Sequence, residues 1–440
     1  MIKQLHEKLM SKQISATELA QDYLNRIKNK NPELNAFITI TEKQALERAS
    51  RIDELIAAGA ELSLLAGIPA SIKDLIMTEG IQTTAGSKIL ENYIAPYDAT
   101  LVKKLKENGM VLLGKNNCDE FAMGGSGENS SFGPTKNPHN LERVPGGSSS
   151  GSAVAVATDL SVYSIGTDTG GSIRQPAAFC GVVGFKPTYG TISRYGLIAM
   201  ASSFDQAGIM ASTIEDVEIV YNTIKGVDKL DSTSLEILNP KSEILNKFKI
   251  QNLNDQKLDL KNFKIGIPKE YFVSGLDKEV ENAVKNIIKK AEKLGAEIVK
   301  VSLPRTEYAL AVYYIIQPAE ASANLARYDG IRYGKKEDAE NLFNVYAKSR
   351  AKYFGDEVKR RIMLGTYALS SGYYDEYYKK AQQVRTLIKR DFEKVFSRNF
   401  AGVDLLITPT TPTPAFKLNE KINSPLQMYL QDVFTVPVNV

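Results

Sequence analysis

Residues 146–152 read Gly-Gly-Ser-Ser-Ser-Gly-Ser, and residues 168–174 read Asp-Thr-Gly-Gly-Ser-Ile-Arg. Both stretches place serines among glycines, which adopt backbone angles closed to other residues. Around Ser172 such a loop lets several backbone N–H groups converge near one hydroxyl, which is the geometry of an oxyanion hole. Taken singly, each stretch is equally typical of a tight turn in which a serine caps a helix. The choice between these interpretations therefore depends on the rest of the chain.

Two catalytic motifs that resemble the first stretch are excluded. Residues 147–151 match the Gly-x-Ser-x-Gly nucleophile elbow, but that fold places its histidine after the serine, and His6 and His139 both precede Ser149. Gly146 and Gly151 have the separation of a phosphate-binding loop, yet Ser152 stands where that loop requires lysine. We therefore expect neither an α/β-hydrolase triad nor a nucleotide site here.

A lysine offers a different base for a serine nucleophile. Lys73 lies in the apolar, strand-like run of residues 68–75. A lysine in such a run can be an edge charge or can pair with the adjacent Asp74. If its ammonium were desolvated, its pKa would fall and it could act as a general base, the role that histidine cannot fill in this chain. The chemistry would then be of the Ser-Lys type.

The composition is that of a globular protein. Of 440 residues, 43% are hydrophobic and 24% are charged, and the net charge is only +4, so no nucleic-acid-binding stripe is indicated. No uninterrupted run of eighteen apolar residues occurs, and the first 26 residues lack the features of a secretory signal. Two cysteines and two histidines are too few for a disulfide framework or a thiolate or multi-histidine metal site. We expect a cytoplasmic protein with no metal and no membrane contact.

The pattern of apolar residues predicts an α/β fold. Residues 1–60 are helical in spacing, with a capping box at Ser15 and Glu18, and form a predicted N-terminal helical layer. From residue 68 onward short apolar strands alternate with amphipathic helices, which indicates a central sheet within a domain spanning residues 61–440. Residues 226–262 are polar and are predicted to be a surface excursion. The sheet is then expected to resume with strands at 264–267 and 297–301, followed by helices over 313–397.

Residues 146–177 as a whole resemble the amidase signature family. Lys73, Ser148 and Ser172 stand 75 and then 24 residues apart, as in the Ser-cisSer-Lys triad of that family. The resemblance implies a central mixed sheet covered by helices on both faces. It also implies that Ser172 is the nucleophile, that Ser148 follows a cis peptide and relays protons, and that Lys73 is the base. Thr169, Gly170 and Gly171 would form the oxyanion hole with the Ser172 N–H.

Further stretches resemble the glutaminase subunits of tRNA-dependent amidotransferases within this family, at residues 117–126, 194–199, 202–206, 320–325 and 369–374. This resemblance implies hydrolysis of glutamine, with Tyr313, Arg361 and Asp432 as substrate-binding residues. An α-carboxylate calls for a guanidinium and an α-ammonium for a carboxylate, so Arg361 and Asp432 suit these two roles. Either charge could also be an ordinary surface residue.

The same resemblance implies partners. The glutaminase would belong to a heterotrimer with the B and C subunits and would supply ammonia for conversion of Glu-tRNA(Gln) or Asp-tRNA(Asn) to the amidated form. ATP, Mg²⁺ and most tRNA contacts would belong to the B subunit, with no cofactor on this chain. Such glutaminases continue beyond the position of Val440, so we expect a C-terminal truncation that removes part of the sheet. A stand-alone amide hydrolase and an inactive, structural subunit are the alternatives.

Overall fold

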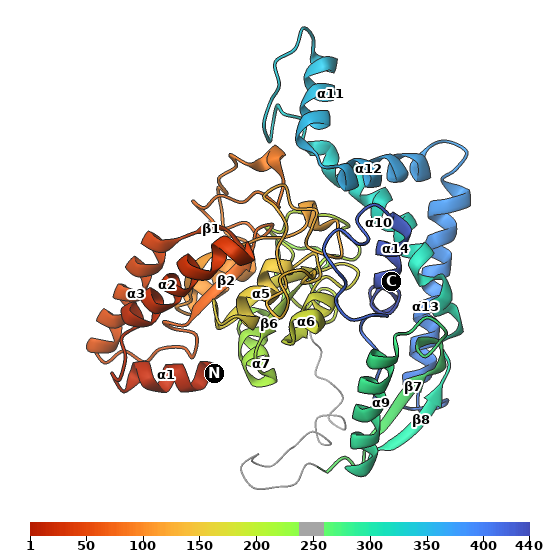
Figure 1. Cartoon of the computed structure of the whole chain (residues 1–440), viewed down its shortest axis with the longest axis horizontal. Helices are drawn as coiled ribbons and strands as arrows, with labels where there is room; N and C mark the ends of the chain where they lie inside the picture. The colour runs from red at the N-terminus through yellow and green to blue at the C-terminus, as the bar shows by residue number, and fades with distance from the viewer. Residues whose placement is uncertain (237–258) are drawn as a thin grey trace.

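The computed structural model describes residues 1–236 and 259–440 and contains two sheets (Figure 1). The larger sheet has six strands in the order β1-β3-β2-β4-β6-β5. The strands are β1 Phe37–Ile40, β2 Pro69–Lys73, β3 Val111–Asn116, β4 Tyr163–Asp168, β5 Val183–Phe185 and β6 Gln206–Ala211. Strand β2 is parallel to β3 and β4, whereas β1, β5 and β6 pair antiparallel with their neighbours. Every residue of the four inner strands is buried, so both faces are covered, and the predicted α/β fold with a mixed sheet is confirmed.

Helices of the first half of the chain cover this sheet. They are α1 Ile2–Met10, α2 Ala16–Leu34, α3 Glu42–Ala57, α4 Thr100–Glu107, α5 Ser150–Ala157, α6 Arg174–Cys180 and α7 Ile214–Ile224. The capping box of Ser15 and Glu18 begins α2 as predicted. Strand β1, inside the region expected to be wholly helical, was missed because four residues between two strong helices carry little periodic signal. The division at residue 60 stays a prediction.

The strands that follow residue 259 form a second sheet. It contains β7 Lys264–Pro268, β8 Glu297–Val301 and β9 Leu405–Leu406 in the order β8-β7-β9, flanked by α9 Lys278–Lys293. The prediction that the central sheet resumes here is wrong for the described residues, in which these three strands pair only with one another. Apolar spacing identifies a strand but does not identify its hydrogen-bonding neighbour, because that neighbour is chosen by long-range packing.

A group of long helices stands beside both sheets (Figure 1). It consists of α10 Ala309–Asn324, α11 Leu342–Tyr353, α12 Asp356–Leu369 and α13 Lys380–Phe396, followed by the short α14 Pro425–Tyr429. Gly365 of α12 lies so close to α10 that a Cβ there would be 1.9 Å from the carbonyl oxygen of Pro318. This contact fixes α12, which carries Arg361, against α10, which carries Tyr313. No described helix is long and apolar enough to cross a membrane.

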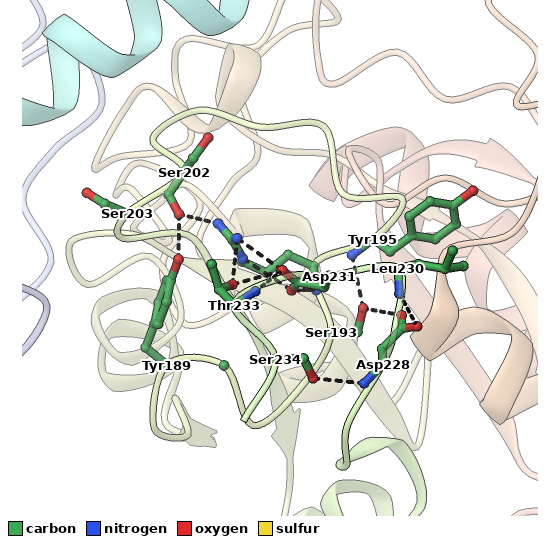
Figure 2. A network of polar contacts seen from close by, with 12 residues as sticks. Tyr189, Ser193, Tyr195, Ser202, Ser203, Asp228, Leu230, Asp231, Thr233 and Ser234 are labelled. Carbon is green, nitrogen blue, oxygen red and sulfur yellow. Dashed lines mark hydrogen bonds and ion pairs between the residues drawn. The ribbon is translucent and has the colours of Figure 1, made fainter. Parts of the chain in front are cut away.

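The predicted surface excursion is only partly described, since residues 237–258 lie outside the described residues. Its first part is held against the body by the network in Figure 2, in which Asp231 pairs with Arg194 at 3.2 Å and Asp228 accepts from Ser193 at 2.6 Å. The Tyr189 hydroxyl donates to the carbonyl oxygen of Ser202 at 2.7 Å in the same network. These contacts hold the loop of residues 189–205, which ends at the buried Asp205 just before β6.

Candidate active site

Lys73 ends the central strand β2 and is fully buried, with 0% of its surface exposed. Its Nζ donates hydrogen bonds to the hydroxyls of Ser148 at 2.7 Å, Ser149 at 2.9 Å and Thr167 at 3.0 Å. The neighbouring Asp74 instead lies 3.7 Å from Lys115, so the pairing of Lys73 with Asp74 and the edge-charge interpretation are both wrong. Burial lowers the pKa of Lys73 from 10.5 to about 8, because the ammonium form loses its hydration. Lys73 is therefore positioned and tuned to exchange a proton with Ser148.

Ser148 lies in the glycine-rich turn before α5, and the peptide bond between Gly147 and Ser148 is cis. A Cβ at Gly147 would be 2.0 Å from Asp119 Oδ2, so only glycine has room there. The Gly147 N–H donates to Gln175 Oε1 at 2.9 Å, which joins this turn to helix α6. The turn thereby presents the Ser148 hydroxyl to Lys73.

Ser172 lies in the loop between β4 and α6, and its carbonyl oxygen accepts from the Ser149 N–H at 3.2 Å. The two serine loops therefore touch, which brings Ser172 beside the Ser148 turn. The Ser172 hydroxyl has no hydrogen-bond partner among the described residues, and 8% of the residue is exposed. The Ser172 hydroxyl is therefore not held by another described side chain, although the residue as a whole is buried.

Asp168 shapes the loop that carries Ser172. Its carboxylate accepts from the N–H groups of Gly171 at 2.9 Å and Ile173 at 3.2 Å, and pairs with Arg174 at 3.0 Å. Burial acts to raise the pKa of Asp168, but the Arg174 guanidinium and the hydrogen bonds outweigh it, so the pKa lies well below its ordinary value. Asp168 is thus ionised at neutral pH, and its carboxylate holds the loop through these contacts.

The three predicted oxyanion residues, Thr169, Gly170 and Gly171, come directly after Asp168 in the chain. The N–H groups of Thr169 and Gly170 have no acceptor within the described ranges, whereas that of Gly171 is already bonded to Asp168. The Thr169 hydroxyl donates to Asp205 at 2.7 Å, and the Thr435 hydroxyl donates to the Gly170 carbonyl at 2.6 Å. Two N–H groups just before Ser172 can therefore receive a developing negative charge.

A cavity of about 400 Å³ contains two of the three predicted substrate-binding residues, Arg361 and Asp432. Arg361 is only 4% exposed, so the surface-charge interpretation is wrong for it. Its Nε donates to Glu357 at 2.7 Å, and a terminal N–H donates to Gln317. Because a guanidinium has five N–H groups, others remain for a ligand carboxylate.

Asp432 belongs to the same lining and is half-buried, and this burial raises its pKa to about 7. One carboxylate oxygen accepts from the Tyr314 hydroxyl at 2.8 Å. Tyr314 lines the cavity, whereas the predicted Tyr313 lies outside that lining, with its ring packed against Gly170. Arg361 and Asp432 thus bring opposite charges to one cavity, whose lining also includes Arg360, Glu120, Glu128, Asp356 and Glu357.

Sequence reasoning missed several of these residues. Ser149 and Thr167 lie within the quoted motif region, but nothing in the spacing showed that both contact Lys73. Gln175 and Glu357 were missed because their partners, Gly147 and Arg361, meet them only through tertiary contacts or a helical turn. Tyr314 follows Tyr313 directly, and one residue of helix rotates the side chain by about 100°, so each faces a different surface.

Known proteins are similar to this chain over most of its length. The family model described as Amidase matches residues 18–440. The chain belongs to the amidase signature family. A relative of this amidase chain, the A subunit of glutamyl-tRNA(Gln) amidotransferase from Carboxydothermus hydrogenoformans, is 56% identical over 439 residues, covering 100% of this chain and 88% of the relative.

Two solved structures are also similar to this chain. The crystal structure of the A subunit of glutamyl-tRNA(Gln) amidotransferase from Thermotoga maritima is 41% identical, with a TM-score of 0.76 over 96% of this amidase chain and 82% of that chain. A peptide amidase bound to the inhibitor chymostatin is 28% identical, with a TM-score of 0.77 over 99% of this chain and 88% of that one. The fold of this chain is thus shared by an amidotransferase subunit and by a peptide amidase.

Proposed function

We propose that this chain is the glutaminase, or A, subunit of a tRNA-dependent amidotransferase. The observation that carries the proposal is the combination of the Lys73–Ser148 contact with a cavity that holds both Arg361 and Asp432. A free amino acid amide needs both charges, whereas a simple acyl amide needs neither. The names of the relatives described above support the same assignment.

The catalytic steps follow from the protonation states. Neutral Lys73 accepts a proton from Ser148 while Ser148 takes the proton of Ser172, and the Ser172 oxygen attacks the side-chain carbonyl of glutamine. The N–H groups of Thr169 and Gly170, joined by that of Ser172, stabilise the tetrahedral oxyanion, each such donor being worth about 3–4 kcal/mol of barrier.

Collapse of the tetrahedral intermediate breaks the carbon–nitrogen bond. The relay returns its proton to the departing nitrogen, which leaves as ammonia, and a glutamyl ester remains on Ser172. Water then attacks the ester and gives a proton to the relay. Glutamate is released, and the relay returns the proton to Ser172, which regenerates the free enzyme. We assign Arg361 to the α-carboxylate and Asp432 to the α-ammonium, in a cavity whose lining does not include Ser172 itself. Tyr313 packs beside the oxyanion loop at Gly170.

The ammonia would pass to a partner. We propose the B and C subunits as the other members of a heterotrimer, with ATP, Mg²⁺ and misacylated Glu-tRNA(Gln) or Asp-tRNA(Asn) bound mainly by the B subunit. Charged tRNA as the co-substrate places the proposed complex in the cytoplasm.

The test is glutamate release from glutamine by the chain purified with its partner subunits. Ser172→Ala should abolish release, and wild type quenched during turnover should carry a glutamyl adduct on Ser172 by mass spectrometry. Ser152→Ala, in the first turn of α5, is the control serine variant, because its hydroxyl makes only long contacts of 3.4 and 3.5 Å. A folded wild-type complex that hydrolyses simple amides but not glutamine would favour the stand-alone amidase instead.

A further inference from the structure

Tyr314 connects the two charged residues of the cavity. Its hydroxyl donates to Asp432 Oδ2 at 2.8 Å, and its ring lies 4.7 Å from the guanidinium carbon of Arg361. The ring also stacks on Tyr429, with the ring centroids 4.0 Å apart and the planes inclined by 19°. Tyr429 in turn lies 4.8 Å from the Arg361 guanidinium and donates to Glu357 at 2.9 Å. The cation site and the anion site therefore share one aromatic pair.

The hydrogen bond from Tyr314 has a definite electrostatic effect. A hydroxyl that donates to a carboxylate favours its ionised form, and burial of Asp432 favours the neutral form. The other titratable groups that face Asp432 are Arg361 from α12, Arg174 from α6, Asp168 from β4 and Tyr313 from α10. The two cations among them are paired, Arg361 with Glu357 and Arg174 with Asp168, which weakens their help to Asp432.

We infer that Tyr314 is a positioning residue that keeps Asp432 oriented and ionised for the α-ammonium group of the substrate. The inference rests on the proposed glutaminase function. Tyr314 acts through Asp432, so it sets the affinity for an α-amino acid amide and leaves the chemical step at Ser172 untouched. It is thereby a determinant of specificity for glutamine over amides without an α-ammonium.

The test is Tyr314→Phe in the complete complex, which removes the hydroxyl and keeps the stacked ring. KM and kcat for L-glutamine are measured from pH 6 to pH 9. Because the pKa of Asp432 is about 7 in the wild type and rises without the Tyr314 hydrogen bond, KM should increase about five- to tenfold at pH 6–7. Near pH 9 Asp432 is ionised in both the wild type and Tyr314→Phe, so the KM values of the two proteins for glutamine should come within about twofold of each other. We expect kcat to stay within about twofold throughout.

The substrate analogue glutaramate, which lacks the α-ammonium, supplies the control. Its KM should be the same for wild type and Tyr314→Phe at every pH. Tyr367→Phe is the matched variant, since Tyr367 is 48% exposed on α12 and should change neither substrate's KM. In an Asp432→Asn background, Tyr314→Phe should add no further increase in the KM for glutamine.

Two results would overturn the inference: a KM ratio for glutamine that is constant from pH 6 to pH 9, or an equal loss of affinity for glutaramate. A variant that only destabilises the fold would give the second result, because the affinities for glutamine and for glutaramate would fall equally. Absence of glutamine hydrolysis by the wild-type complex is a different outcome, which contradicts the proposed function itself.

Discussion

The pH dependence of kcat is expected to report the neutral fraction of Lys73. With a pKa of about 8, about one-eleventh of the lysine is neutral at pH 7, one-half at pH 8 and ten-elevenths at pH 9. Under saturating glutamine kcat should therefore rise about tenfold from pH 7 to pH 9 and level off above pH 8. A lysine with the ordinary pKa of 10.5 would instead give a rise of about a hundredfold over the same interval, with no plateau.

Saturating glutamine separates the effect of Lys73 ionisation on kcat from the effect of Asp432 ionisation, which we expect to change KM. The assay is a continuous measurement of glutamate formation, with burst kinetics to isolate acylation of Ser172. Lys73→Arg should lose activity at every pH, because a guanidinium stays protonated in this range. A kcat that keeps climbing tenfold per pH unit to pH 10, or one that is flat from pH 6, would refute Lys73 as the desolvated base.

Further predictions concern the relay and the scaffold. Ser148→Ala should lower kcat by about a thousandfold or more while the KM for glutamine changes little, as steady-state kinetics would show. Gly365→Ala places a Cβ 1.9 Å from a backbone carbonyl of α10, so urea denaturation should show a loss of roughly 1–3 kcal/mol. Asp168→Asn leaves Arg174 without its partner and should cost roughly 3–5 kcal/mol at pH 7. The pKa of Asp168 in the folded protein lies below the ordinary value, so ionised Asp168 stabilises the fold above about pH 4. Below pH 4 the free energies of unfolding of wild type and Asp168→Asn, measured in urea, should therefore become more similar.

The C-terminal segment illustrates how distant residues complete the site. Thr435 donates to the Gly170 carbonyl, and a Cβ at Gly171 would lie 2.3 Å from its hydroxyl. Arg174 donates to the Thr435 carbonyl at 3.1 Å. Residues more than 260 positions apart in the chain thus hold the loop of Ser172, an arrangement that no local sequence pattern contains.

Local sequence predicted what depends on neighbouring residues. The capping box that begins α2 and strands β2 and β8 follow from steric and hydrogen-bonding rules that act over a few positions. The pairing of strands did not follow, since β7, β8 and β9 form their own sheet through long-range packing. Strand identity is a local property, whereas strand partnership is a property of the whole fold.

For the site, the sequence by itself determined the residue types and the spacing of Lys73, Ser148 and Ser172, which indicated Ser-Lys chemistry, and the resemblance to the amidase signature family implied an amide substrate. Only the tertiary structure decided that Lys73 is fully buried among three hydroxyls, which lowers its pKa. It also placed Tyr314, and not Tyr313, in the cavity with Arg361 and Asp432. The physical reason is that desolvation and charge pairing depend on distances in space, which chain order does not specify.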